Sequence, residues 1–488
     1  MSAAPNRPRS LRIAIIGAGP GGLCMAIGLK QAGFDDFVLF EKGEAVGGTW
    51  YHNRYPGCAC DLPSQLYSFS FEIKHDWSRP YGSQAEILGY MEDLAEKYDL
   101  LSHCRFGSEV VAARWDEGRS RWTLDFESGD ALEADVVVSA IGMFNELSWP
   151  DIDGLDSFGA TRFHSARWNW DHDLTGERVG VIGSAASAVQ FVPEIVKEAG
   201  QVHLFQRTPN WAIPKEDAPF SDELLEAFRA DPKLSLAIRD ECFRQVDEGM
   251  TFSDPARLAE LESQGLAAID VVEDPEVRRK LRPQHPFGCK RPLLSNYFYE
   301  AFNRPNLELV TDAIARITHD GIVTVDGRTR RIDTLIIATG FSTTKYLSAI
   351  DVTGRRGRRI GDAWNDGARA HLGVSTAGFP NLFMLYGPNT NNGSILTMIE
   401  YQVEYALRQI QRITNEGLAW LDVRPDPMER YNEEVQQAIG SIEVWQADCN
   451  GYYRTPSGRV VTQWPFSMSE FRERTSKPDV EDYETAPL

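Results

Sequence analysis

The sequence predicts an α/β fold built from two βαβ units, with a helical insertion in its second half. A short apolar run that ends in a glycine-rich turn occurs twice, at 11–22 and at 178–188, and each turn is followed by a helical segment and a second apolar run. The glycines that open the turns, Gly17 and Gly183, are 166 positions apart, which is too far for a solenoid repeat and suits two separate domains. The predicted fold class is therefore α/β, with two Rossmann-like dinucleotide-binding domains and a helical insertion.

Composition and charge exclude several classes of protein. Of the 488 residues, 42% are hydrophobic and 25% are charged, as in ordinary globular proteins, so a wholly disordered chain is excluded. The formal charge of −21 argues against a nucleic-acid partner and against stable membrane association, because both partners are anionic. The seven cysteines form no CxxC pair, so we expect no disulfide framework and no metal site. A reducing, cytoplasmic location fits this composition.

The first unit is predicted from its apolar runs. A buried strand at 11–16, a helix at 23–31 and a second strand at 37–40 form a βαβ unit. Further strands are predicted within 110–126 and at 135–141.

The second unit repeats this order and contains the insertion. Its predicted elements are a strand at 178–182, a helix at 189–197 and strands at 202–205 and 333–338. A further strand at 381–386 and a helix at 399–416 are predicted after this unit. The acidic segment at 215–285 is helix-prone, with helices expected at 222–234 and 254–268. The polar tail from Pro478 is expected to be loose.

The first glycine-rich turn has the chemistry of a dinucleotide site. Gly17 permits the tight turn, Gly19 lets the backbone approach a pyrophosphate, and Gly22 allows close packing of the helix. Glu41 follows Gly17 by 24 positions, at the end of the second strand, where a carboxylate accepts hydrogen bonds from a ribose diol. This pattern predicts a site for FAD or an NAD-like dinucleotide; a glycine turn without a ligand is the alternative.

The second turn differs in its ribose reader. Ala185 replaces the middle glycine of the turn that runs from Gly183 through Ser187. Arg207 follows Gly183 by the same 24 positions, and a guanidinium there, with the Thr208 hydroxyl, suits a 2′-phosphate. The second site is therefore predicted to bind NADPH, and a surface charge is the alternative for Arg207.

The pair of sites indicates electron transfer. Hydride passes from NADPH to a flavin, and a dithiol acceptor would need a CxxC motif that the chain lacks. Oxygen is the remaining common acceptor. We predict an FAD-binding domain (first part) over 1–150, an NADPH-binding domain with the insertion over 151–340, and the second part of the FAD-binding domain with the C-terminal segment over 341–488.

Several linking segments resemble the Baeyer–Villiger monooxygenase family. The resemblance covers about 11–470 and is closest in style to the 4-hydroxyacetophenone type. It is carried by the motifs Gly47-Gly48-Thr49-Trp50-Tyr51, Asn53-Arg54-Tyr55-Pro56-Gly57, Cys60-Asp61-Leu62-Pro63-Ser64, Phe163-His164-Ser165-Ala166-Arg167-Trp168, Lys290-Arg291-Pro292, Ala338-Thr339-Gly340-Phe341 and Gly387-Pro388-Asn389-Thr390-Asn391.

The resemblance implies three catalytic residues. Arg291 would lie over the flavin and stabilise a C4a-peroxyflavin and the oxyanion of its ketone adduct, and a surface charge is the alternative. Asp61 would hold Arg291 by an ion pair, or would cap a turn. His164, in the loop that links the domains, would couple domain movement to the nicotinamide or take part in proton transfer.

The resemblance also implies further cofactor contacts. Lys290 would reach the NADPH phosphate beside Arg207. Gly48 and Thr49 belong to the flavin-side motif, and Trp50 and Tyr67 would line the flavin, with core packing as their alternative. Asn389 would lie at the flavin edge. The insertion and the residues Tyr452, Tyr453 and Trp464 are candidates for the wall of the substrate pocket.

Three functions follow as hypotheses. In the first, an FAD- and NADPH-dependent monooxygenase inserts one oxygen atom from O2 next to a ketone carbonyl and forms an ester or lactone. The second keeps both cofactors but oxygenates a sulfide or amine, as in a flavin-containing monooxygenase. The third is a catalytically silent nucleotide-binding protein. The partners expected are a small ketone and O2, in a monomer or homodimer.

Overall fold

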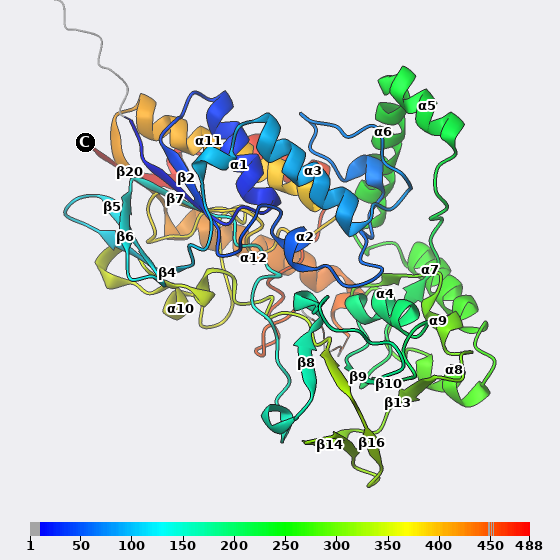
Figure 1. Ribbon diagram of the computed structural model, residues 1–488. Helices are drawn as coiled ribbons and strands as arrows, with labels where there is room; N and C mark the ends of the chain where they lie inside the picture. The colour runs from blue at the N-terminus through cyan, green and yellow to red at the C-terminus, as the bar shows by residue number, and fades with distance from the viewer. Residues whose placement is uncertain (1–9, 448, 450, 452) are drawn as a thin grey trace, which may run out of the picture.

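The computed structural model describes residues 10–447, 449, 451 and 453–488, and its first unit is built on a five-stranded parallel sheet (Figure 1). The strand order is β19-β7-β1-β2-β3. Its members are β1 (Ile13–Ile16), β2 (Phe37–Phe40), β3 (Cys104–Arg105), β7 (Val136–Ser139) and β19 (Leu382–Met384). Every residue of β1 and β7 is buried, as expected for a parallel sheet that is covered on both faces.

Helices cover this sheet. Helix α1 (Pro20–Gln31) starts with proline, which suits the first turn of a helix, and it packs against α11 (Ile395–Asn415) and α3 (Gln84–Lys97). The short α2 (Thr49–His52) and the 3₁₀ turns η1 (Ser64–Leu66) and η2 (Leu101–His103) complete this side. None of the helices in the described ranges is long and apolar enough to cross a bilayer.

The second unit contains another five-stranded parallel sheet, in the order β13-β10-β9-β17-β8. Its strands are β8 (Thr161–His164), β9 (Arg178–Ile182), β10 (Gln201–Phe205), β13 (Leu307–Val310) and β17 (Thr334–Ile337). Helix α4 (Ala186–Ile195) follows β9 and packs against α9 (Phe298–Ala301). The antiparallel strands β14 (Ile314–Thr318), β15 (Gly321–Thr324) and β16 (Thr329–Arg331) extend below it in Figure 1. The predicted pair of Rossmann-like units is confirmed.

Two linkers run side by side between the units. Leu147 pairs with Phe341 in an antiparallel bridge, and the Ser148 amide donates to the Gly340 carbonyl at 2.9 Å. The chain therefore enters the second unit through one linker and returns beside it, and β19 then joins the first sheet next to β7. The residue boundaries of the three predicted segments stay a prediction.

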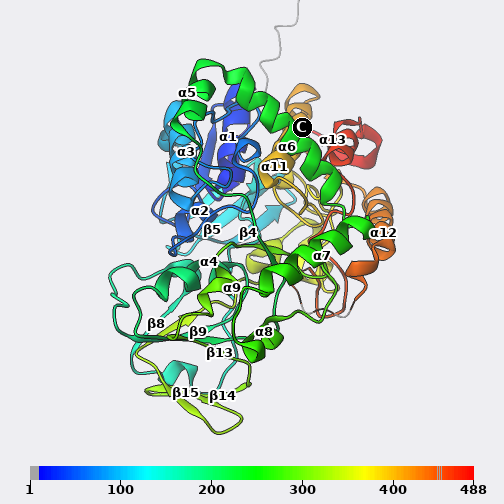
Figure 2. The ribbon, with the colours of Figure 1, turned by 90° about the vertical axis from the view of Figure 1, so that its right-hand side faces the viewer.

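The insertion is helical and spans both units (Figure 2). It holds α5 (Asp222–Ala230), α6 (Pro232–Gly249), α7 (Pro255–Ile269) and α8 (Pro275–Leu281). The single helix expected at 222–234 is instead two helices, because Asp231 caps a new helix whose first residue is Pro232. From α6, Arg239 donates to the carbonyls of Gln65 and Ser68 at 3.0 and 2.9 Å, so the insertion contacts the first unit.

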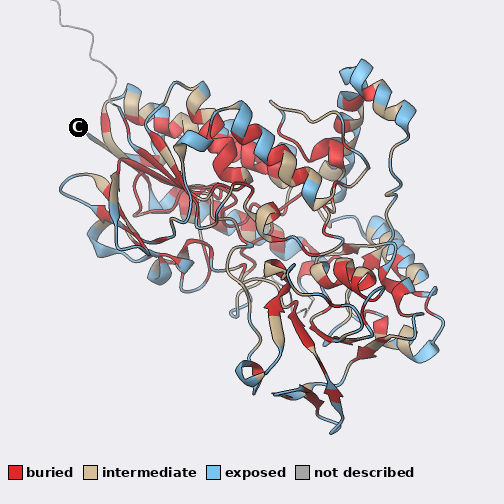
Figure 3. Ribbon diagram, viewed as in Figure 1, coloured by how far each residue is buried: buried red, intermediate tan, exposed pale blue. Residues whose placement is uncertain are grey.

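Smaller elements complete the described fold. A four-stranded sheet holds β4 (Val110–Asp116), β5 (Arg121–Phe126), β6 (Ala131–Ala134) and β18 (Asp351–Thr353). Others are β11 (Ala212–Ile213), β12 (Leu293–Leu294), α10 (Ile360–Ala363), α12 (Pro425–Ser441) and α13 (Met468–Ser476). Figure 3 shows the central strands of both sheets mostly buried and α5 largely exposed.

The polar tail is ordered, so the expectation of a loose end is wrong. Strand β21 (Tyr483–Pro487) pairs antiparallel with β20 (Leu418–Val423). Tyr483 is 3% exposed, and its hydroxyl lies 2.9 Å from Ser375 Oγ and 2.8 Å from the Tyr405 hydroxyl. One buried aromatic residue therefore anchors a segment whose other side chains are mostly polar.

One disulfide is present, a bond that the sequence analysis did not predict. Cys289 is bonded to Cys449, 160 positions away. Spacing could not indicate this pair, because only the tertiary fold brings the two residues together. The thiols of Cys24, Cys58, Cys60, Cys104 and Cys242 are free.

Candidate functional site

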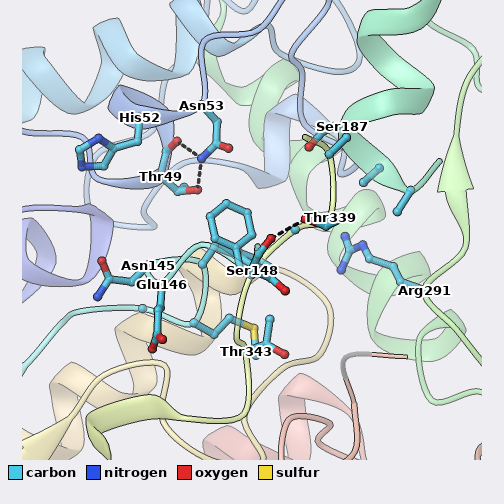
Figure 4. Close-up of a pocket in the computed structure, with 18 of the residues that line it drawn as sticks. Thr49, His52, Asn53, Asn145, Glu146, Ser148, Ser187, Arg291, Thr339 and Thr343 are labelled. Carbon is cyan, nitrogen blue, oxygen red and sulfur yellow. Dashed lines mark hydrogen bonds between the residues drawn. The ribbon is translucent and has the colours of Figure 1, made fainter. Parts of the chain in front are cut away.

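A large cavity, of about 1930 Å³, is lined by residues of both sheets and both linkers (Figure 4). Most of the predicted site residues line it: Gly17, Gly19, Glu41, Gly48, Thr49, Trp50, Asp61, Tyr67, Gly183, Ser187, Arg207, Thr208, Lys290 and Arg291. Three predicted residues do not line it: Gly22, His164 and Asn389. Two dinucleotide-type turns thus open onto one space.

The first turn is shaped for a close backbone approach. Gly17 has φ +105°, and a Cβ built there would lie 2.7 Å from the Ala140 oxygen. A Cβ at Gly48 would lie 2.7 Å from the Gly19 Cα, so two backbone segments touch at the mouth of α1. Gly22 lies beneath the turn, since a Cβ there would lie 2.0 Å from the Gly17 oxygen. Its role is packing, which agrees with its absence from the cavity wall.

The start of α1 leaves its amides available to an anion. Its N-cap residue, Gly19, makes no side-chain cap hydrogen bond, and the first turn holds no acidic residue. Unpaired amides and the helix dipole together favour a phosphate. Thr49 is positioned by Asn53, whose Nδ2 donates to the Thr49 carbonyl at 2.8 Å and lies 3.2 Å from Thr49 Oγ1 (Figure 4).

Glu41 is a fixed carboxylate beside this turn. It is 5% exposed, and it accepts from the amides of Ala18 and Gly43 at 2.9 and 2.8 Å. His52 lies 4.0 Å away, but burial, with smaller contributions from nearby Arg167, Lys42 and Arg54, lowers its pKa to about 4. The imidazole is therefore neutral at pH 7, and the carboxylate is left to accept from a ribose diol.

The second turn is built in the same way despite its alanine. Gly183 has φ +107°, and a Cβ there would lie 2.4 Å from the Ala338 oxygen. Ala185 is the N-cap of α4 at φ −91°, a conformation that alanine adopts without strain. This helix also lacks a side-chain cap and an acidic first turn. Its free amides therefore fit a phosphate, as those of α1 do.

Two cations gather at the second site. Arg207 and Lys290 both line the cavity, and burial, followed by the Arg207 charge, lowers the pKa of Lys290. Neither side chain has a carboxylate partner among the described residues. Burial and the Lys290 charge also lower the pKa of His285 to about 4. Unneutralised positive charge suits a group with more than one negative charge, such as a phosphate.

Arg291 and Asp61 form an ion pair in the cavity wall. Arg291 Nε donates to Asp61 Oδ2 at 3.0 Å, and Nη2 donates to the same oxygen. The side chains are 30% and 32% exposed, so the pair faces the cavity rather than the core. Figure 4 shows the guanidinium extending into the cavity, across from Asn145 and Glu146. The predicted pairing is thus present, and the catalytic role stays a prediction.

Trp50 and Tyr67 form one aromatic unit on the first-sheet side. Trp50 Nε1 donates to the Tyr67 hydroxyl at 3.1 Å, and the two rings meet edge to face at 5.6 Å. Each residue is 8% exposed and each lines the cavity. Burial holds the pKa of Tyr67 well above its usual value, so its hydroxyl stays protonated.

His164 lies behind the cavity, between the linkers. It is 2% exposed, its Nδ1 accepts from the Ala166 amide at 3.1 Å, and its ring packs on Trp149 and Phe341 at 5.5 and 6.2 Å. Burial and the Arg167 charge lower its pKa to about 4. Because the imidazole is buried, neutral and not part of the cavity wall, a structural role in coupling the two linkers suits it better than a role in proton transfer.

Asn389 is not among the residues that line the cavity, and its expected place at the flavin edge stays a prediction. It is 2% exposed, and its Nδ2 donates to the carbonyls of Val460 and Gln463 at 3.1 and 2.9 Å. The amide is used to hold the 460–463 segment. No signal in the sequence separates this use from ligand contact.

The residues that line the cavity also differ from those expected for the wall of the substrate pocket. No described residue of the 215–285 insertion lines the cavity, and Trp464 is fully buried away from it. Tyr453 does line it, whereas Tyr452 lies outside the described residues. Sequence reasoning missed several lining residues from the linkers, the Tyr55 loop and helix α4, among them Tyr55, Asn145, Glu146, Gln190, Thr343 and Lys345.

Comparisons with known proteins agree with this geometry. A family model described as pyridine nucleotide-disulphide oxidoreductase matches residues 14–224. The chain is 40% identical to a Baeyer-Villiger monooxygenase of Pseudomonas aeruginosa, over 99% of this chain and 93% of that protein.

Solved structures align over nearly the full chain. A cyclohexanone monooxygenase from Rhodococcus sp. Phi1 bound to NADP+ superposes with a TM-score of 0.89 at 30% identity, over 99% of this chain and 100% of that one. The OTEMO complex with FAD and NADP superposes with a TM-score of 0.87 at 31% identity, again over 99% and 100% of the two chains.

Proposed function

The chain belongs to the Baeyer–Villiger monooxygenase family, and we propose that it uses FAD, NADPH and O2 to insert one oxygen atom next to the carbonyl of a small ketone. The product is an ester or a lactone. The observation that carries this proposal is the shared cavity: two glycine-rich turns open onto it, and the Arg291–Asp61 pair faces it.

The first sheet holds FAD in this proposal. The amides at the start of α1 bind its pyrophosphate, and the Glu41 carboxylate accepts from its adenosine ribose. Trp50 and Tyr67 present an aromatic wall with one internal hydrogen bond, which keeps both rings in place. Bound FAD supplies the redox chemistry, taking a hydride from NADPH and activating O2.

The second sheet holds NADPH. The start of α4 binds the pyrophosphate, and Arg207, Thr208 and Lys290 bind the 2′-phosphate. The missing acid at the position that matches Glu41 removes the repulsion that a 2′-phosphate would meet there.

Arg291 supplies a fixed cation where negative charge develops on oxygen during insertion. Asp61 binds the guanidinium through Nε and Nη2, which fixes its direction before the substrate enters. A preorganised charge of this kind stabilises an anionic transition state without reorganisation. No step assigned to Arg291 requires it to lose a proton.

No feature of the described site specifically favours either alternative, the sulfide or amine oxygenase or the catalytically silent nucleotide-binding protein. Oxygenation of a sulfide or amine would use the same cofactor sites, and a silent nucleotide-binding protein would not need the Arg291–Asp61 pair. The monomer or homodimer state and the cytoplasmic location belong to the proposal as well.

The test is product formation by the purified holoenzyme. Denaturation should release FAD, and NADPH oxidation should rise when a ketone is added, with one O2 consumed per NADPH. A matched panel of ketones and sulfides then separates the hypotheses. Colourless protein, or oxidation of sulfides alone, would contradict the proposal.

A further inference from the structure

The loop that leads to Asp61 makes a direct contact with helix α4. This loop, 54–59, starts just after α2 and ends two residues before Asp61. Helix α4 belongs to the second sheet and carries the proposed NADPH turn at its start. The contact therefore joins the flavin side of the cavity to the nicotinamide side.

The Gln190 side chain makes two hydrogen bonds across this contact. The Tyr55 hydroxyl donates to Gln190 Oε1 at 2.9 Å, and Gln190 Nε2 donates to the Ala59 carbonyl at 3.0 Å. The amide thus binds both ends of the loop, and its orientation is fixed because one end must accept and the other must donate. Tyr55 is 8% exposed, and both Tyr55 and Gln190 line the cavity.

The backbones approach closely at the same place. Gly57 has φ +74°, and a Cβ built there would lie 2.8 Å from the backbone carbonyl oxygen of Gln190. The Tyr55 ring packs on Phe191 at 6.0 Å, and Trp170 Nε1 donates to the Arg54 carbonyl at 2.9 Å. The Tyr55, Gly57 and Ala59 contacts therefore hold the loop on α4, and the Trp170 hydrogen bond fixes its first residue to the segment before β9.

The contact lies one helical turn from the phosphate-binding turn. Ser187 and Gln190 are three positions apart on α4, so they share a face of the helix. A shift of the loop relative to α4 would change the distance between the flavin side and the nicotinamide side. The rate of hydride transfer depends steeply on this distance, since a misplacement of about 1 Å can lower the rate about 100-fold.

We propose that Gln190 and Tyr55 form a positioning pair for hydride transfer, which sets the approach of the nicotinamide to the flavin. The inference rests on the proposed function and adds to it. Neither residue exchanges a proton or electron; each acts through the contact between loop 54–59 and α4.

The experiment measures flavin reduction directly. Gln190→Leu, Tyr55→Phe and the double variant are mixed with NADPH without oxygen in a stopped-flow spectrometer, and the limiting rate constant and the apparent Kd are read separately. We expect Gln190→Leu to lower the rate constant at least ~10-fold, because misplacement acts on the chemical step. The Kd should change less than about threefold, because the phosphate contacts remain. The double variant should be no slower than Gln190→Leu, since both remove the same contact.

A matched control separates positioning from folding. Asn306 donates two hydrogen bonds just past the C-terminal end of α4, to the carbonyls of its C-cap residue Val196 and of Ala199, remote from the loop. Asn306→Leu should lower thermal stability and leave the rate constant unchanged. Loss of folded enzyme in any variant would lower the amplitude of the absorbance change rather than its rate constant.

Two results overturn the inference. Unchanged reduction rate constants in Gln190→Leu and Tyr55→Phe would show that the contact does not position the nicotinamide. A similar loss of rate in Asn306→Leu would show that any loosening of α4 has the same effect. Failure of the wild-type holoenzyme to be reduced by NADPH would instead contradict the proposed function, so the two failures are distinguishable.

Discussion

Arg291 and Asp61 are 230 positions apart in the chain, and they meet in the wall of one cavity. Their pairing removes the cost of orienting a cation during the reaction, because the guanidinium is already held at Nε and Nη2. The same reasoning applies to Glu41, whose carboxylate is held by the amides of Ala18 and Gly43. At the residue scale, the site consists of charges that are fixed before any ligand binds.

Replacing Arg291 should remove oxygen insertion and spare flavin reduction. Arg291→Ala should lower the rate of ester or lactone formation about 100-fold or more, as loss of one preorganised donor does elsewhere. Product formation is measured by gas chromatography beside anaerobic reduction by NADPH. Arg278→Ala is the control, because that guanidinium donates to the Val272 carbonyl within the insertion and does not line the cavity. Lactone formation at the wild-type rate in Arg291→Ala would refute the assignment.

Replacing Arg207 should change coenzyme preference. Arg207→Ala removes a charged contact to the 2′-phosphate and should raise the KM for NADPH by about 10- to 100-fold. The KM for NADH, which lacks that phosphate, should change little. Steady-state rates with both coenzymes give the ratio of kcat/KM. An unchanged ratio would place Arg207 outside the phosphate site.

The elements show which parts of the fold can be predicted from sequence. Strands β2 and β9 run from Phe37 to Phe40 and from Arg178 to Ile182, as predicted, because continuous apolar runs bounded by turns are local signals. Both glycine-rich turns were predictable for the same reason. The Tyr55–Gln190 contact, the tail strand and the position of Asn389 were not, because each depends on segments that meet only in the folded chain.

Helix α11 carries a buried acid that should make stability depend on pH. Glu400 is 6% exposed, and burial raises its pKa from 4.5 to about 7, against the opposing effects of the Ser70 hydrogen bond and the Arg239 charge. Because the folded state holds this proton more tightly than the unfolded state, stability should fall as pH rises from about 4.5 to about 7 and then level off.

Glu400→Gln tests this dependence. The free energy of unfolding of the variant should decrease less steeply as the pH rises. At pH 8 the variant should be more stable than wild type by on the order of 1–3 kcal/mol. The buried Asp422, whose pKa burial raises to about 6, keeps the rest of the slope. Thermal unfolding across the pH range is the measurement, and the exposed neighbour Glu404→Gln is the control. Parallel profiles for Glu400→Gln and wild type would contradict the account.

At the scale of the whole molecule, two sheets share one cavity, and several connections besides the Tyr55–Gln190 contact join the two units. The linkers pair at Leu147 and Phe341, α6 reaches the first unit through Arg239, and the Cys289–Cys449 disulfide ties the Lys290–Arg291 segment to the C-terminal part. None of these connections is local in sequence. The cavity therefore depends on the complete fold rather than on either βαβ unit alone.

The disulfide should contribute measurably to stability. It closes a loop of 160 positions, so the chain-entropy model gives a contribution of up to about 5 kcal/mol. Dithiothreitol should lower the midpoint of urea unfolding for wild type and leave Cys289→Ser unaffected. An unchanged urea midpoint for wild type in the presence of dithiothreitol would show that the disulfide does not contribute to stability.

The central claim is that this cavity joins NADPH, FAD and O2 in one reaction on a ketone. Mass spectrometry of the product formed from a cyclic ketone under ¹⁸O2, with NADPH oxidation followed in the same sample, tests it most directly. We predict a lactone that carries one ¹⁸O atom for each NADPH consumed. Unlabelled ketone recovered across a broad panel, while NADPH is consumed or a sulfide takes up the label instead, would contradict the claim.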